Sequence, residues 1–287
     1  MTEGWSRWPA PAKLNLFLHI VGRRADGYHL LQTVFQLLDW GDSVRLRPRQ
    51  DGVIARLEGL ADVLPEQDLA VRAALALRPR AGSELGADIA IEKHIPVGGG
   101  LGGGSSDAAT VLLALNEIWR LQLSVDELAE IALPLGADVP LFVRGKSAWA
   151  EGIGEQLTPI DLPSRSYVVV DPRVHVPTGQ LFQASELTRN TPRLTISGFL
   201  GGVETANVFA PVVRARFPQV AAALEWLSKF GDARLSGSGG CVFVGVESVE
   251  HARRIASECP AEFKAYCAQG VARSPLLDAL REYRAKK

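Results

Sequence analysis

The sequence has little cysteine and no surplus of charge of either sign. Its 287 residues contain three cysteines, Cys241, Cys259 and Cys267, an odd number, and no Cys or His pair has the spacing of zinc ligands. We interpret them as small buried hydrophobic residues in a reducing compartment. Lys plus Arg (31) nearly balances Asp plus Glu (32), for a net charge of −1. No cationic excess is available to drive non-specific nucleic-acid binding.

Long apolar runs are also missing. None approaches the roughly 18 residues that a membrane-spanning helix needs. The apolar segment 14–21 contains Asn15 and His19, and Gly22-Arg23-Arg24 follows it without a small-residue cleavage site. It does not have the pattern of a signal peptide. We expect a soluble cytoplasmic protein with no membrane partner, and the sequence leaves its oligomeric state open.

What is present is ordinary globular composition, with 47% hydrophobic and 22% charged residues. The length favours about two domains, and we predict a boundary near 159–163, which gives domains 1–160 and 161–287. Strands are predicted at 14–21, 43–47, 53–57, 88–92, 147–151, 167–171, 233–235 and 241–246. Helices are predicted at 69–77, 105–116, 125–133, 178–186, 211–216, 218–230 and 249–258. In the second half of the chain the predicted helices and strands alternate, which indicates a second α+β layer.

A glycine-rich loop is the most informative local feature. Six of the seven residues 98–104 are glycine, between the strand 88–92 and a helix that starts at Ser105. Such a loop loses much chain entropy on ordering, so its presence needs a reason. Close approach of backbone N–H groups to a phosphate would supply that reason. A flexible connector is the alternative, but a linker would not run straight from a strand into a capped helix.

Two common phosphate-binding motifs fit this loop poorly. The Walker pattern is absent because Ser105 follows Gly104 where a lysine should stand. The dinucleotide pattern G-x-G-x-x-G does match at Gly98, Gly100 and Gly103, but a second strand ending in an acidic residue should follow, and two helices follow instead. A nicotinamide-dependent oxidoreductase is therefore the weaker alternative.

Three separate segments carry a family resemblance. The ATP-phosphate loop of the galactokinase, homoserine kinase, mevalonate kinase and phosphomevalonate kinase superfamily is similar to Pro96-Val97-Gly98-Gly99-Gly100-Leu101-Gly102-Gly103-Gly104-Ser105-Ser106. Segments 11–16 and 235–240 add two further motifs in the expected order. Within the superfamily the chain most closely resembles the 4-diphosphocytidyl-2-C-methyl-D-erythritol kinase family, through 24–29, 135–142 and 190–192. The resemblance covers essentially the whole chain.

The resemblance implies an α+β two-domain small-molecule kinase. It implies a ribosomal-protein-S5-domain-2-like N-terminal part, a ferredoxin-like C-terminal α/β sandwich, and an active site in the cleft between them. The glycine loop, from Pro96 to Ser106, would bind ATP. Asp68 would lie near the adenosine, where relatives usually carry asparagine. Mg²⁺ is expected with ATP, but the sequence contains no carboxylate cage, so no protein ligand for a metal is assigned.

Asp138 and Lys13 are the candidate catalytic residues. Taken alone, Asp138 before Val139-Pro140 could be a helix cap or turn residue. Lys13 could be a charged residue at the edge of a strand that prevents pairing with another chain, or a cation that faces the active site. The resemblance places the lysine beside the carboxylate and the reacting hydroxyl. Asp138 would then accept the hydroxyl proton, while Lys13 would keep Asp138 ionised and stabilise the alkoxide.

The acceptor is expected to carry a cytidine diphosphate group. The resemblance implies that Tyr28 and Phe182 enclose the cytosine ring and that His29 hydrogen-bonds to the base. Without the family, half-buried packing would be the simpler interpretation of Tyr28 and Phe182. Asn15 is expected to make polar contacts near the acceptor, and Thr178 to cap its helix, contact the substrate, or both, with the cap preferred. A kinase for another small alcohol, such as homoserine, is the rival within the superfamily.

Overall fold

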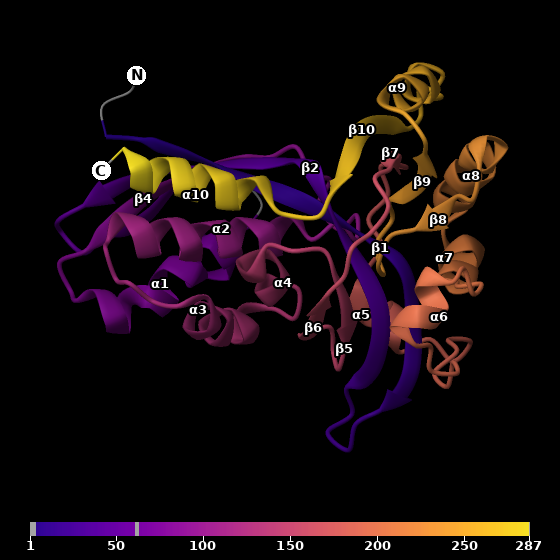
Figure 1. Ribbon diagram of the computed structural model, residues 1–287, viewed down its shortest axis with the longest axis horizontal. Coiled ribbons are helices and arrows are strands. Elements are labelled where there is room, and N and C mark those ends of the chain that lie inside the picture. The colour runs from indigo at the N-terminus through magenta and orange to yellow at the C-terminus, as the bar shows by residue number, and fades with distance from the viewer. Residues whose placement is uncertain (1–3, 61–62, 287) are drawn as a thin grey trace.

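The computed structural model describes residues 4–60 and 63–286, which form two lobes (Figure 1). The first lobe gathers most elements of the first half of the chain. These elements are β1 (Ser6–Arg23), β2 (His29–Arg49), β3 (Ile54–Glu58), α1 (Leu69–Ala81), β4 (Gly86–Glu92), α2 (Gly103–Ile118), α3 (Val125–Ala132), α4 (Val139–Arg144), β5 (Ala148–Glu151) and β6 (Gln156–Pro159). The antiparallel pair β1 and β2 extends beyond this lobe into the second.

The second lobe has the ferredoxin-like topology that the resemblance implied. Its elements are β7 (Ser166–Asp171), α5 (Thr178–Phe182), α6 (Ile196–Leu200), α7 (Ala210–Arg216), α8 (Pro218–Leu227), β8 (Arg234–Leu235), β9 (Val242–Val246), α9 (Val249–Ser257) and β10 (Lys264–Val271). Its strands are antiparallel in the order β10-β7-β9-β8. Numbered within the lobe, this is the 4-1-3-2 order of a βαββαβ unit. The predicted α+β fold class is confirmed.

Strand β10 joins the two lobes into one sheet. Gly270 and Val271 pair with Leu38 and Leu37 of β2, so the sheet continues as β3-β4-β2-β10-β7-β9-β8. After β10 the chain returns to the first lobe as α10 (Pro275–Ala285). Leu276 and Leu280 of α10 are buried in the same core as α1 and α2. The division into 1–160 and 161–287 stays a prediction, and the end of its second part packs on the first lobe.

Most predicted elements are present, with differences at their ends. The helix after the glycine loop begins at Gly103, two residues before the predicted start, and the segment 43–47 is only the end of the long strand β2. The first half of β2 was not predicted because it lacks a regular alternation of apolar and polar residues. Three of its buried side chains are polar: Gln32, Thr33 and Gln36. The sequence reading also omitted α4, β6, α6, β10 and α10.

The predicted helix 178–186 is wrong in its second half, because α5 ends at Phe182. Carbonyls of Phe182 and Ala184 accept hydrogen bonds from the Arg189 guanidinium, which takes the place of helical partners. The cysteines are all free thiols, with Cys241 buried and Cys259 and Cys267 half-buried. Across residues 4–60 and 63–286 no helix combines the length and apolarity needed to cross a bilayer.

Candidate active site

The glycine loop connects β4 to α2 in a conformation that only glycine adopts readily. Gly98, Gly100 and Gly102 have positive φ angles of 72°, 77° and 74°. Backbone that repeatedly enters the left-handed region forms a concave surface of N–H groups, which suits an anion. Gly102 is also the N-cap of α2, a helix of 16 residues whose positive end adds to the attraction.

A second glycine turn, at 236–240, packs directly on the first. A Cβ atom added to Gly100 would lie 2.0 Å from the Ser236 carbonyl oxygen, and one added to Gly239 would lie 2.1 Å from the Gly100 nitrogen. The amide of Cys241 donates to the Gly99 carbonyl at 3.1 Å. The two lobes therefore meet backbone to backbone at the glycine loop, and the contacts at Gly100 and Gly239 leave no room for a side chain.

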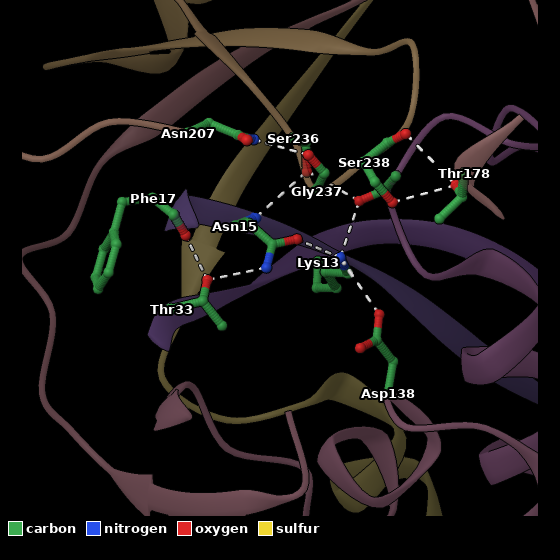
Figure 2. Close-up of polar contacts among 11 residues, drawn as sticks. Lys13, Asn15, Phe17, Thr33, Asp138, Thr178, Asn207, Ser236, Gly237 and Ser238 are labelled. Carbon is green, nitrogen blue, oxygen red and sulfur yellow. Dashed lines mark hydrogen bonds and ion pairs between the residues drawn. The ribbon is translucent and has the colours of Figure 1, made fainter. Parts of the chain in front are cut away.

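Lys13 lies at the centre of the polar contacts between the lobes (Figure 2). Its side chain is only 4% exposed, and Nζ lies 3.4 Å from Oδ2 of Asp138. The same Nζ donates to the carbonyl of Gly100 at 2.9 Å and to Oδ1 of Asn15. The charge of Lys13 is thus held at the glycine loop and beside the carboxylate, and the strand-edge interpretation of this lysine is wrong.

Asp138 immediately precedes α4, but its carboxylate makes no capping hydrogen bond to that helix. It is 30% exposed and lies on the wall of a cavity of about 340 Å³ that Lys13 and Asn15 also line. Asp138 occupies the N-cap position of α4 without capping the helix through its side chain, and its carboxylate contacts the buried Lys13 instead. A catalytic role for Asp138 stays a prediction.

Asn15 is fully buried and its amide is satisfied. Its Nδ2 donates to the Thr33 hydroxyl at 2.9 Å, and its backbone N–H donates to Ser236 Oγ at 3.3 Å. Ser236 Oγ in turn donates to the Gly100 carbonyl at 2.9 Å. This network connects β1, β2 and both glycine loops around Lys13, as Figure 2 shows for the labelled members.

Two adjoining cavities extend from the glycine loop past Asp138, and Gly100 and Gly102 line the smaller one. The smaller holds Lys13 and Asp138, and the larger, about 920 Å³, is lined by Tyr28, His29 and Phe182. They share four wall residues: Leu31, Ala137, Ile153 and Phe182. A long molecule can therefore reach from the carboxylate of Asp138 to the aromatic side chains.

The aromatic side chains of the larger cavity are His29, Phe182 and Tyr28, and enclosure of a cytosine by Tyr28 and Phe182 stays a prediction. The rings of His29 and Phe182 are stacked with centroids 5.3 Å apart, and Phe182 also packs edge-on against Phe209. Tyr28 is 62% exposed on the same cavity wall. Burial, then Arg189, then Arg23 lower the pKa of His29, so its ring is neutral at pH 7.

Thr178 does not cap its helix. The N-cap of α5 is Pro177, and the Thr178 hydroxyl accepts from Ser238 Oγ at 3.1 Å instead. The preferred cap interpretation is wrong because this hydroxyl connects α5 to the second glycine turn at the cavity wall.

A third cavity, of about 220 Å³, lies at the outer side of the glycine loop. Asp68, Pro96, Val97 and Gly104 are among its wall residues. Both carboxylate oxygens of Asp68 are engaged, one with the Ala70 N–H as the N-cap of α1 and the other with Arg56 at 2.6 Å. Contact between Asp68 and a nucleotide stays a prediction.

Comparison with known proteins assigns the chain to a family. The model of the GHMP kinases N terminal domain matches residues 68–146, and that of the GHMP kinases C terminal domain matches 194–265. The 4-diphosphocytidyl-2-C-methyl-D-erythritol kinase of Xanthomonas euvesicatoria pv. vesicatoria is 57% identical, over 96% of this chain and 94% of that protein. The protein of the same name from Halorhodospira halophila is 54% identical over 98% of both chains. The chain belongs to the 4-diphosphocytidyl-2-C-methyl-D-erythritol kinase family.

A solved structure agrees with this assignment. The crystal structure of a 4-(cytidine 5'-diphospho)-2C-methyl-D-erythritol kinase superposes with a TM-score of 0.81 at 35% identity, over 93% of this chain and 100% of that one. The chain is thus a kinase with the fold of this family, and the nicotinamide-dependent alternative is wrong.

Sequence reasoning missed three side chains of this kinase's cavities. Thr33 holds Asn15, Arg189 contacts His29, and Lys93 lies beside the glycine loop between Asp42 and Asp107. Thr33 and Lys93 carry no signal of their own in the sequence. Arg189 stands next to the family segment 190–192, and that position was the one clue available.

Proposed function

We propose that the chain transfers the γ-phosphate of ATP to the 2-hydroxyl of 4-diphosphocytidyl-2-C-methyl-D-erythritol. The products are the 2-phosphate and ADP, in the non-mevalonate route to isoprenoid precursors. Near-full-length relatives at 54–57% identity that carry this kinase name support the substrate. The observation that supports the chemistry most strongly is the buried Lys13 held 3.4 Å from Asp138, between the glycine loop and the long cavity.

The chain's own groups divide the transfer between them. The N–H groups of the loop from Pro96 to Ser106 and the start of α2 would hold the phosphates of ATP. Asp138 would accept the proton of the attacking hydroxyl, and Lys13 would stabilise the alkoxide and the incoming phosphoryl group. Because Nζ of Lys13 is fixed by Gly100 and Asn15, its charge needs no reorganisation as the reaction proceeds.

The other predicted residues would contact the parts of the two substrates that do not react. Tyr28, Phe182 and His29 would bind the cytosine, with stacking for affinity and a hydrogen bond for selection. Asn15 and Thr178 would line the path of the methylerythritol and diphosphate groups. Asp68 would form part of the adenosine wall.

Mg²⁺ is part of the proposal, because charge on the β- and γ-phosphates must be neutralised. The described residues contain no cluster of three His, Cys, Asp or Glu side chains that could cage a metal. The Ser106 hydroxyl, in the first turn of α2, is fully buried and lacks a hydrogen-bond partner within the described chain. Ser106 would hold the ion together with phosphate oxygens, as is usual for a cation that prefers oxygen ligands and keeps water. We place the reaction in the cytoplasm, where ATP is available and three free thiols stay reduced.

An ADP-release assay with two acceptors tests the proposal. The cytidylated methylerythritol should support turnover with ATP, and homoserine should not, because homoserine has no base for the aromatic pocket. Turnover with homoserine alone would contradict the substrate while leaving the kinase assignment intact.

A further inference from the structure

Arg189 lines the larger cavity, where the cytosine base is proposed to bind, and makes four polar contacts there. The proposed phosphoryl transfer assigns no role to this arginine. Its Nη2 donates to the carbonyls of Phe182 at 3.1 Å and Ala184 at 2.6 Å, and Nη1 donates to the Leu187 carbonyl at 3.0 Å. These bonds hold the turn that follows α5 and therefore the position of the Phe182 ring. Arg189 lines the same cavity as the stacked pair of His29 and Phe182.

The fourth contact constrains the protonation of His29. Nε of Arg189 lies 3.2 Å from Nε2 of His29. A guanidinium is always charged and can only donate, so Nε2 of the imidazole must accept. Because burial and the two nearby arginines lower the pKa of His29, the ring is neutral and its single proton must be on Nδ1. Across the described chain no hydrogen bond to Nδ1 is present, and this N–H remains available to a ligand.

We infer that Arg189 is a positioning residue that determines base selection, by fixing His29 as an Nδ1–H donor toward the base. Cytosine and uracil both offer an acceptor at O2, but only cytosine has an acceptor at ring N3, where uracil carries a proton. A fixed donor that reaches N3 therefore favours cytosine over uracil. The inference rests on the proposed function, because it names how that acceptor's base is selected.

A purely structural role for Arg189 makes a different prediction. If the guanidinium only held the turn 182–187, its loss would loosen Phe182 and weaken cytidine and uridine acceptors alike. If it sets the His29 proton, its loss frees the ring to adopt the Nε2–H form, and discrimination between the bases falls. The two roles are separated by the proton position and by the ratio between acceptors.

The proton position can be measured without any substrate. The chain has five histidines, so ¹⁵N-histidine labelling gives a simple spectrum, and His29→Gln identifies the His29 signals. In the wild-type protein at pH 7.5 we expect Nδ1 protonated and Nε2 unprotonated, the reverse of the form that free histidine prefers. Arg189→Leu should shift His29 toward Nε2–H. Arg193→Leu, which removes an exposed arginine paired with Glu151, should leave it unchanged.

The spectrum can contradict the inference on the wild-type protein alone. A proton on Nε2 of His29 would overturn it, even if the Arg189→Leu protein fails to fold. An unchanged His29 spectrum in a folded Arg189→Leu protein would overturn it equally.

Kinetics supply the second readout. We expect Arg189→Leu to lower the ratio of kcat/KM for the cytidine acceptor over its uridine counterpart by about tenfold, mainly through KM. Arg189→Lys retains a donor and should recover part of this ratio. An equal loss on both acceptors would assign Arg189 a structural role only. If neither acceptor is phosphorylated by the wild-type protein, the proposed function fails while the spectrum still decides the role of Arg189.

Discussion

The two adjoining cavities have two ends that are built in different ways, a proposed phosphate end at the glycine loop and a proposed base end at Tyr28 and His29. At the phosphate end, backbone packs on backbone where Gly100 meets the turn at Ser236, and Lys13 is only 3% exposed. At the base end, side chains from separate loops form the walls, with Tyr28 62% exposed and Arg189 holding the turn behind Phe182. Close backbone contacts hold the first end, whereas the second depends on a few side-chain contacts.

This difference separates chemistry from recognition. A preorganised, buried charge stabilises a transition state without reorganisation, so changes at the phosphate end should reduce kcat. An open aromatic pocket contributes binding that ground state and transition state share, so changes at the base end should alter KM.

The largest effect is expected at Asp138. Asp138→Asn keeps the shape of the side chain but removes the proton acceptor, and kcat should fall about 10³-fold. Calorimetric titration should find ATP and acceptor binding nearly unchanged. The matched control is Asp126→Asn in α3, an exposed carboxylate paired with Arg144, which should retain full activity. Near-normal kcat in Asp138→Asn would remove this residue from the mechanism.

The next effect tests the backbone contact between the loops. Gly100→Ala places a methyl group 2.0 Å from the Ser236 carbonyl at a positive φ of 77°, and should lower the free energy of unfolding by about 3 kcal/mol. Thermal denaturation measures this, and KM for ATP should rise. Gly104→Ala, in the first turn of α2, meets only Leu69 Cδ1 at 3.6 Å and should unfold like the wild type. Equal stability of the two variants would refute the proposed rigidity of this end.

At the base end the expected effect is confined to one substrate. Tyr28→Ala removes an exposed ring from the cavity wall, and KM for the acceptor should rise about tenfold while KM for ATP stays constant. Steady-state kinetics with each substrate varied gives both constants, and Tyr28→Phe should behave as the wild type because the ring is retained. A similar rise in both KM values would contradict the assignment of this pocket to the base.

The smallest effect concerns a buried charge beside the phosphate end. Burial raises the pKa of Asp107 to about 7 against the opposing attraction of Lys93, from an unperturbed value of 3.8. Between these values the folded state holds a proton that the unfolded state releases, so this group's contribution to stability falls as pH rises from about 4 to about 7. Asp107→Asn should therefore raise the melting temperature by a few °C at pH 8 and have little effect at pH 4. A lower melting temperature at pH 8 would show that the Lys93 contact outweighs the burial.

The conformation of the glycine loop was predictable from the residues themselves, because it depends on backbone freedom and on near neighbours in the chain. Lys13 and Asp138 were identified only through the family resemblance, because they meet from distant parts of the chain. Arg189 and Thr33 act through contacts with residues far away in sequence, and a single arginine or threonine carries no periodicity. Strand β10 and helix α10 were missed for a related reason, since their places depend on pairing with β2 and packing on α2.

A crystal structure with a non-hydrolysable ATP analogue and the cytidylated acceptor would locate both substrates. We expect the triphosphate on the backbone amides of 98–104, the acceptor hydroxyl within hydrogen-bond distance of Asp138 and Lys13, and the cytosine beside His29. A triphosphate bound elsewhere, or an acceptor hydroxyl remote from Asp138, would contradict this expectation.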